Sequence, residues 1–456
     1  PTFYAVGGDY GDKPNDGYFV LNGLLESDRT PKPQYFTVAR VNQPIRVRAM
    51  NLALGKIQVE NRHAFIDLTN FMATWEWSDN GVISATGKLP PLHCAAGETC
   101  DVAIPEAPTA PGGHQRHLTL RFALAQPTAW ADAAFVVAQD QLALDDAPTL
   151  TAPTLTPGHL VVEPTAGAIT IRSQEFSARI SKASGMIESL CYHGHELLTS
   201  PLHLCFWRPP VTNDRGWKMP TLLGAWRLAG EHSEATNVAS TVNADGTLTV
   251  TAGIRIPVGS SHATLTYQMD DTGRIIVRAA IALSPAEQPA PGHELPCVGM
   301  TGGLVSELHS IEWLGLGPDE SYADRRAAVS FGDFHADALA WNHNYTPPQE
   351  TGHRSEVRRA RFSAPDGYGL QVCAVGAPFG FNLWPWTAAD LESTTHPYLL
   401  KPREFLTLNL DSAQMGLGGV QGWGARPLDP YLLSADKTYQ LSFVLEPFTR
   451  QTHSPP

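Results

Sequence analysis

The sequence predicts a mainly β protein built from antiparallel sandwiches. Its 456 residues include 39 Gly and 37 Pro while 43% are hydrophobic, a combination typical of a core-forming chain with many turns. Short runs in which apolar and polar residues alternate, bounded by Gly, Asn, Asp and Pro, recur through most of the chain. At roughly 100 to 200 residues per domain, this length predicts two to four domains.

Residues 1–42 do not show the regular alternation of apolar and polar residues that most of the chain shows. They contain a short apolar run at 3–8, a loop rich in Asp, Asn and Gly, and a Pro-punctuated segment, which together predict a strand, a loop and a short helix. Such a βα unit cannot bury both of its faces alone, because a parallel strand needs neighbouring strands and covering helices. We therefore interpret residues 1–42 as the tail of a larger domain and expect sequence to be missing upstream of Pro1.

Residues 43–144 carry runs of five to eight residues at turn spacing, the pattern of an immunoglobulin-like β-sandwich. Trp75 and Trp77 lie on one face of a strand at period two, which favours packing in its core. Residues 145–158 (DDAPTLTAPTLTPG) are rich in Pro and Thr without periodicity, so they predict a linker.

Residues 159–456 resume the alternation on a larger scale and predict a large antiparallel sandwich of two sheets. The best helical candidates within it are two short segments, 322–331 (YADRRAAVSF) and 387–394 (TAADLEST).

Composition excludes several classes of function. The net charge of −13 makes nucleic acid an unfavourable partner. No apolar run approaches the roughly 20 residues that span a bilayer, so we expect a soluble protein without a membrane partner. Six Cys are sparse for this length and favour a reducing, cytoplasmic compartment. No phosphate-binding glycine motif occurs in a nucleotide-binding context.

The richest polar loop is 7–23. Its acidic and amide side chains offer oxygen ligands that suit a hard cation such as Na⁺, Mg²⁺ or Ca²⁺; they are Asp9, Asp12, Asn15, Asp16 and Asn22. The alternative interpretation is that these residues simply cap turns.

Three further features could carry chemistry. The Gly-rich segment 313–325 (WLGLGPDESYADR) predicts a mobile loop, within which Asp324 and Arg325 favour a local salt bridge. Trp423, flanked by Gly on both sides, has no strand face to pack on and favours stacking on a sugar, or else an anchored loop or subunit contact. Three histidines in polar loops could act as a general acid or base, or only as ordinary hydrogen-bonding residues; they are His343, His353 and His396.

These motifs resemble landmarks of one family in the order in which that family has them. The loop 7–34 (GGDYGDKPNDGYFVLNGLLESDRTPKPQ) resembles the end of the catalytic barrel of glycoside hydrolase family 2 β-galactosidases of the long, lactose-cleaving bacterial type. WLGLGPDESYADR, YTPPQETGHRSEVR, FNLWPW, HPYLL and MGLGGVQGWGARPLDPY resemble successive landmarks of that family's C-terminal domain.

The resemblance implies a fold and an activity. Residues 1–42 would be the last βα unit of a TIM barrel, 43–144 an immunoglobulin-like domain, and 159–456 a galactose mutarotase-like sandwich. The enzyme would be a retaining β-galactosidase, which needs two carboxyl groups about 5 to 5.5 Å apart. The family's two catalytic Glu lie on earlier barrel strands, so the resemblance implies an upstream portion or a separate large subunit, and a chain that is inactive alone.

The resemblance also implies site residues. The Phe19 carbonyl and the Asn22 side chain would bind Na⁺, completed by an Asp from the missing part and by galactose; Asp16 would support this loop, and Trp423 would stack on the aglycone. The loop 315–325 would move near Phe19, Mg²⁺ would bind in the missing part, and the full enzyme would be a homo-oligomer. The chain departs from the family pattern at Gly17, Val420 and Gln421.

Two other functions stay open at this point. One is a carbohydrate-binding or assembly module without catalysis. The other is a mutarotase-like activity of the large sandwich, with His343 and Glu350 as its acid and base. The sandwich of this family resembles the mutarotase fold, but fold alone is weak evidence for chemistry.

Overall fold

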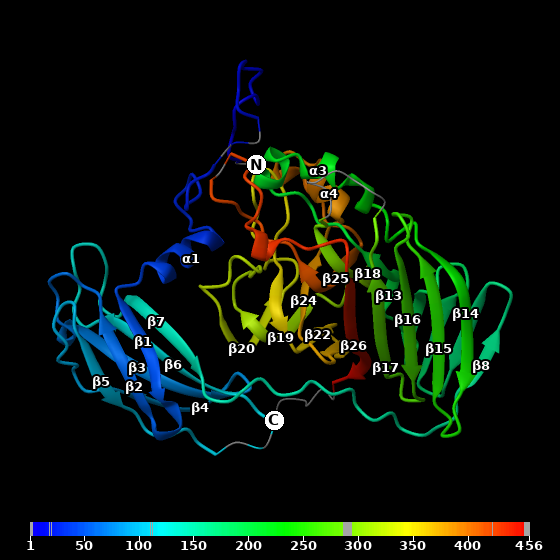
Figure 1. Cartoon of the computed structure of the whole chain (residues 1–456), viewed down its shortest axis with the longest axis horizontal. Coiled ribbons are helices and arrows are strands. Elements are labelled where there is room, and N and C mark those ends of the chain that lie inside the picture. Colours follow the sequence, from blue (N-terminus) through cyan, green and yellow to red (C-terminus); the bar gives the residue numbers. More distant parts are fainter. Residues whose placement is uncertain are drawn as a thin grey trace.

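The computed structural model describes residues 3–17, 19, 21–109, 111, 113–285, 294–421 and 423–450. Within this part of the chain the strands form four sheets, of three, four, nine and ten strands, and every strand pair is antiparallel. The two small sheets lie at one side of the molecule and the two large sheets at the other, with the N-terminal segment above them (Figure 1). The mainly β class predicted from the sequence is therefore confirmed.

Among its described residues, the N-terminal segment contains one regular element, the helix α1 (Pro33–Val41), where a short helix was predicted. Pro33 starts it, since the ring fixes φ and the first turn needs no N–H donor. The strand predicted at 3–8 is wrong: residues 3–6 are irregular and 7–10 form turns. No described strand lies beside these residues to supply the hydrogen bonds that a parallel strand requires.

The smaller sandwich contains residues of the predicted immunoglobulin-like region. Its three-stranded sheet has the order β1 (Ile45–Asn51), β2 (Lys56–Asn61), β5 (Thr99–Ala103). Its four-stranded sheet has the order β4 (Val82–Lys88), β3 (Phe71–Asp79), β6 (Arg116–Leu124), β7 (Val136–Ala143). Two 3₁₀ turns, η1 (Leu52–Leu54) and η2 (Leu68–Asn70), connect strands. Trp75 and Trp77 are both buried in the core between the sheets, as their spacing predicts.

The larger sandwich pairs a ten-stranded sheet with a nine-stranded sheet. The ten-stranded sheet has the order β21 (Arg354–Val357), β24 (Phe379–Trp384), β25 (Phe405–Gln414), β18 (Cys297–Val305), β13 (Leu198–Cys205), β11 (Ile187–Tyr192), β10 (Phe176–Ser181), β9 (Ala168–Arg172), β8 (Val161–Pro164), with β12 (His195–Glu196) beside β11. The nine-stranded sheet has the order β14 (Glu234–Val242), β15 (Leu248–Arg255), β16 (His262–Met269), β17 (Ile275–Ala282), β26 (Thr438–Thr449), β23 (Tyr368–Ala374), β22 (Arg359–Ser363), β19 (Ser310–Gly317), β20 (Ser330–Asp337).

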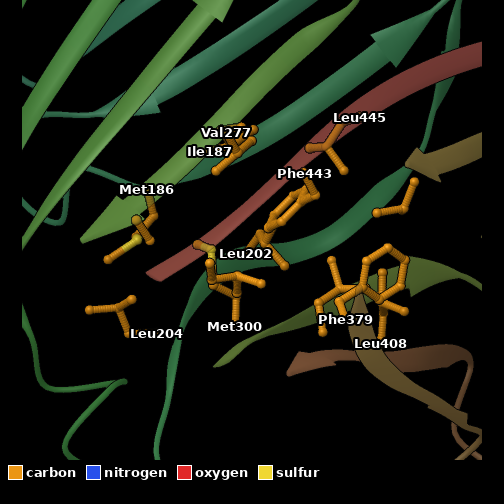
Figure 2. Close-up of a cluster of buried hydrophobic side chains, with 14 of the residues drawn as sticks. Met186, Ile187, Leu202, Leu204, Val277, Met300, Phe379, Leu408, Phe443 and Leu445 are labelled. Atoms are coloured by element: carbon orange, nitrogen blue, oxygen red, sulfur yellow. The ribbon is translucent and has the colours of Figure 1, made fainter. Parts of the chain in front are cut away.

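One face of each large sheet is apolar, and the two faces form a single core. Leu202, Met300 and Leu408 of the ten-stranded sheet lie near Phe443 and Leu445 of the other sheet (Figure 2). Because side chains alternate along a strand, the residues between these leucines and methionines point to the opposite, outer face of the ten-stranded sheet. That outer face carries polar side chains.

Short helices lie at one end of the large sandwich (Figure 1): α2 (Thr212–Gly216), α3 (Met219–Leu222), η3 (Gly224–Trp226), α4 (Ala388–Ser393), with η4 (Pro397–Leu399) and η5 (Asp429–Tyr431) in nearby loops. The helix predicted at 387–394 is confirmed as α4, which Thr387 caps through the N–H of Asp390 at 3.1 Å. Among the described residues, none of the helices has the length and apolar character needed to cross a membrane.

The helix predicted at 322–331 is wrong. Tyr322 and Arg325 exchange two backbone hydrogen bonds in a tight turn, and β20 begins at Ser330. The strand forms because Phe331 pairs with Leu316 of β19, so tertiary pairing overrides the local helical preference of the Arg-Ala-rich run.

Candidate functional site

A cleft of about 690 Å³ opens between the N-terminal segment and the large sandwich. Phe19 and Asn22 line it from the first segment, and Trp423 lines it from the loop between β25 and β26. Most of the remaining wall comes from the 324–325, 345–350 and 417–421 segments. The structure thus brings three of the four predicted site residues to one cavity, which we call the Trp423 cleft; the fourth, Asp16, does not line it.

Trp423 and Phe19 stack on each other in this cleft. Their ring centroids are 4.0 Å apart and their planes differ by 17°, yet the Trp423 side chain stays 71% exposed. The backbone N–H of Trp423 donates to the Gln421 side chain, one of the residues that depart from the family pattern. An indole held against a second ring, with most of its surface open, is a flat apolar platform.

The loop that carries Trp423 is anchored on helix α2. Asn213 accepts from the N–H of Gly424 at 3.1 Å and donates to the carbonyl of Ala425 at 2.6 Å. Gly424 has φ +90°, and a Cβ there would lie 2.3 Å from the carbonyl carbon of Gly216, so only glycine fits this position. Glycine at position 424 therefore allows the backbones of Gly424 and Gly216 to lie close together.

Asp16 acts through its backbone in this structure. Its carbonyl accepts from the N–H of Phe19 at 3.1 Å, closing a turn that presents Phe19 to the cleft. Asn22 is exposed and lines the cleft. Beside it, the buried ammonium of Lys32 donates to the carbonyl of Leu21 and lies 3.8 Å from the carboxylate of Glu26. Burial lowers the pKa of Lys32 more than Glu26 raises it.

Glu320 organises the part of the cleft wall that contains Arg325. The mobile loop predicted at 313–325 is wrong for residues 313–317, which belong to strand β19. The Glu320 carboxylate pairs with Arg325, accepts from the Tyr345 hydroxyl at 2.5 Å and accepts from the N–H of Gly352 at 2.7 Å. Burial alone would disfavour the charge of Glu320, but Arg325 and these hydrogen bonds outweigh it, so the pKa of Glu320 lies below its ordinary value. The Glu320 carboxylate is thus held by three partners within the protein.

The predicted salt bridge between Asp324 and Arg325 is wrong, since Arg325 pairs with Glu320 instead. One carboxylate oxygen of Asp324 accepts from the N–H groups of Leu417 and Gly418, at 2.8 and 2.9 Å. Asp324 thus ties the Gly-rich segment to the loop that carries Trp423. Sequence reasoning missed this role because the two partners lie far along the chain.

Glu350 is a second buried carboxyl group in the cleft wall, with 1% of its surface exposed. It accepts from the Asn382 side chain at 2.9 Å. Burial raises the pKa of Glu350 well above its ordinary value, more than the nearby Arg208 lowers it. Burial therefore disfavours the charged form of this carboxyl group.

The three loop histidines have structural partners. His343 lies 2.9 Å from Glu26 and His396 lies 2.9 Å from Asp9, so both attach the N-terminal segment to the large sandwich. His353 contacts the carbonyl of Ser321 at 2.8 Å. His343 pairs with Glu26 while Glu350 pairs with Asn382, so the two members of the mutarotase hypothesis have different partners.

The described residues include no group of three or more His, Cys, Asp or Glu side chains that could hold a metal ion. The Phe19 carbonyl and the Asn22 amide are neutral oxygen donors. Carbonyl and amide oxygens of this kind suit a hard cation, and two of them alone do not complete a cation site.

Three family models match successive stretches of the chain. The model of the β-galactosidase small chain matches residues 172–445, that of β-galactosidase domain 4 matches residues 57–145, and that of the TIM barrel domain of family 2 glycosyl hydrolases matches residues 1–47. The chain belongs to the β-galactosidase small chain family. The resemblance read from the motifs is therefore confirmed.

Curated relatives agree with this family. The β-galactosidase of Priestia megaterium is 29% identical over 452 residues, which cover 98% of this chain and 43% of the relative. The β-galactosidase of Lactobacillus delbrueckii subsp. bulgaricus is 29% identical over 448 residues, covering 97% of this chain and 42% of the relative. This small-chain family member thus spans less than half the length of the curated relatives that it matches.

Among solved structures, a galactose mutarotase related enzyme from Lactobacillus acidophilus matches with a TM-score of 0.34 and 9% identity, over 65% of this chain and 100% of the other. This similarity is too low to bear on the chemistry of the small-chain family member.

Proposed function

We propose that this chain forms one part of a retaining β-galactosidase that hydrolyses terminal β-D-galactosyl residues such as those of lactose. In this proposal Trp423 stacks on the aglycone of the substrate. The observation that supports it is the exposed indole of Trp423, backed by Phe19 at 4.0 Å over a cleft of about 690 Å³. The apolar face of a sugar ring packs well on such a platform.

We further propose that the Phe19 carbonyl and the Asn22 side-chain oxygen are sodium ligands. Both residues line the Trp423 cleft, and both oxygens are neutral. Sodium would supply a fixed positive charge that orients sugar hydroxyls. The chain's own part would be to hold Phe19 through the turn closed by the Asp16 carbonyl, so that the aromatic ring and the cation ligand are positioned together.

The two catalytic carboxylates, in this proposal, come from outside this chain, as does the Mg²⁺ site. A retaining glycosidase needs a proton donor and a nucleophile about 5 to 5.5 Å apart. Two buried glutamates near the cleft are bonded within the protein: Glu320 pairs with Arg325, and Glu350 accepts from Asn382. In this proposal neither of them is the nucleophile.

The platform is tested with Trp423→Ala and its matched control Trp130→Ala, which removes another exposed indole, 66% accessible, on the smaller sandwich. Lactose affinity of the purified chain, measured by calorimetry, should fall at least about tenfold in Trp423→Ala, equivalent to about 1.4 kcal/mol, and stay constant in the control. Chromogenic β-galactoside hydrolysis should require the upstream portion. Equal affinities in both variants would contradict the platform, and hydrolysis by the chain alone would contradict the placement of the carboxylates.

The sodium ligands are tested by exchanging NaCl for choline chloride at equal ionic strength. We expect the galactoside affinity of the unmodified chain, completed with its upstream portion, to fall without sodium, because a cation that orients the sugar is lost. Asn22→Ala should bind weakly in either salt, whereas Asn70→Ala, an exposed amide on the smaller sandwich, should keep the sodium response. A sodium response retained by Asn22→Ala would rule out the Asn22 ligand.

A further inference from the structure

A second cleft, of about 700 Å³, lies on the outer face of the ten-stranded sheet. Its floor is formed by strands β13, β18 and β25, and its walls by α4 and by the segments that flank α3 and η3. In Figure 1 these strands run side by side, with α3 and α4 at their upper end. We call it the β18 cleft. It shares no lining residue with the Trp423 cleft.

The floor of the β18 cleft is a row of polar side chains in register. His203 of β13 pairs with Thr301 of β18, and Thr301 pairs with Asn409 of β25. Residues paired across neighbouring strands point to the same face, so the three side chains lie in a line. Thr407 and Gly303 form the next such pair along the same two strands. Beside this pair the Ser200 hydroxyl, which also lines the cleft, accepts from the N–H of Gly303 at 2.8 Å.

One wall is a cluster of paired charges around Glu392, in the last turn of α4. The Glu392 carboxylate pairs with Arg227 at 2.7 Å and accepts from the Trp207 indole N–H at 3.3 Å. Arg215 donates to the Glu392 carbonyl at 2.9 Å, while its Nε atom is buried without a hydrogen-bond partner. Two arginines and two glutamates, Glu231 being the second, line the cavity, so it carries no net charge.

The floor offers neutral hydrogen-bonding groups of both kinds. His203 contacts the Leu204 carbonyl through Nδ1 at 2.9 Å, which fixes Nδ1 as the donor and leaves Nε2 as an acceptor. Burial lowers the pKa of His203, so the ring is neutral at pH 7. The hydroxyls of Thr301 and Thr407 can donate or accept. A phosphate or carboxylate would need a surplus of positive charge, whereas a polyhydroxylated neutral molecule matches this lining.

The floor is also fixed in orientation before any ligand arrives. Asn409 donates to the Asn382 side-chain oxygen at 2.5 Å, and Asn382 donates to Glu350 at 2.9 Å. Asn382 and Glu350 are buried, so this chain of hydrogen bonds cannot rotate freely. Pre-oriented polar groups favour binding because less side-chain entropy is lost on ligand contact.

We propose that the β18 cleft is a second sugar-binding site that takes a neutral monosaccharide or similar polyol, with His203, Thr301, Thr407 and Asn409 as the floor that bonds its hydroxyls. This inference is independent of the function proposed for the Trp423 cleft, because the two cavities use different residues.

The test uses D-galactose as the probe and the full 456-residue chain. Thr301→Val with Thr407→Val removes two hydroxyls from the floor at nearly constant shape, and valine suits a strand. Thr264→Val, at an exposed position of β16, is the matched control. Calorimetry should give a galactose-binding event for the unmodified chain. The double variant should weaken this event at least tenfold, whereas Trp423→Ala and the control should keep it.

Hydrogen exchange locates the event in the chain. Galactose should protect the backbone of 300–304 in the unmodified chain and in Trp423→Ala, and should not protect it in the double variant. The proposal is overturned if Trp423→Ala abolishes all galactose binding, if the double variant binds as the unmodified chain does, or if the chain binds no galactose. Circular dichroism and the melting temperature confirm that each variant is folded, so a lost event reports on the cleft.

Discussion

One carboxylate oxygen of Asp324 links the segment 313–325 to the loop that carries Trp423. Asp324→Ala leaves the N–H groups of Leu417 and Gly418 without their acceptor, and hydrogen bonds to a charged group contribute about 1.5 to 3 kcal/mol each. We expect faster hydrogen exchange at 416–418 and roughly tenfold weaker lactose binding, since the Trp423 loop loses its tie. Asp366→Ala, in an exposed turn, is the control. Unchanged exchange at 416–418 would refute the positioning role.

The sequence identified residues that line the Trp423 cleft, but it did not identify the side chains that hold the loops of this cleft in place. The glycines around Trp423 indicated a side chain outside the core, and the motif resemblance led to Phe19 and Asn22, which line the same cavity. Asp324 was misjudged because its sequence neighbour Arg325 offered an obvious partner. Contacts between distant loops leave no local pattern, so neither Glu320 pairing with Tyr345 nor Asp324 bonding to Gly418 could be predicted.

Strand β6 of the smaller sandwich meets β20 of the larger one through His117, whose ring stacks on Phe331 with centroids 4.9 Å apart. Burial and the nearby Arg358 lower the pKa of His117 to about 4. An unfolded histidine titrates near 6.5, so between these two pH values the unfolded state binds the extra proton. Acid should therefore lower the free energy of unfolding across this window, by up to about 3 kcal/mol at pH 4.

His117→Gln should remove this part of the acid sensitivity, because glutamine does not titrate. The measurement is urea unfolding at pH 7, 6, 5 and 4, and His262→Gln, at an exposed position of β16, is the control. If the pH dependence of His117→Gln equals that of the unmodified chain, another group causes the effect.

Period-two alternation predicted the strands well, whereas the short helices and the loop segments were predicted poorly. Runs such as GAITIRS and YQLSFVLEPF became β9 and β26, because period-two alternation reports which face a strand buries. Helix α2 was not predicted, since its five residues are too few to show a helical period. The helix predicted at 322–331 is wrong because Ala and Arg favour a helix only locally. Pairing with β19 places the end of this run in a strand instead.

The residues that the structure describes contain two separate clusters of buried hydrophobic side chains, one in each sandwich. We expect two thermal unfolding transitions, with the boundary in the predicted linker 145–158. Phe122→Ala in the smaller core and Phe381→Ala in the larger core should each cost about 3 to 5 kcal/mol. Calorimetry should show each variant shifting one transition and sparing the other. A single transition that both variants shift equally would show that the sandwiches unfold as one unit.

Several hydrogen bonds join the two sandwiches. Gln141 of β7 donates to the Phe331 carbonyl at 2.9 Å and accepts from its N–H at 2.7 Å, and Gln139 donates to Ser330 at 3.3 Å. Polar surfaces of this kind couple domains weakly compared with a shared apolar core. The division at 145–158 itself stays a prediction.

The stacked pair of Phe19 and Trp423 joins segments near opposite ends of this chain. During synthesis on the ribosome, Phe19 emerges long before Trp423, and every strand of the large sandwich except β26 is made in between. A nascent polypeptide therefore cannot display this aromatic platform until nearly all of these residues have been translated and folded. In a coupled translation assay, sugar binding by the Trp423 cleft should therefore appear only when synthesis and folding of these residues are nearly complete.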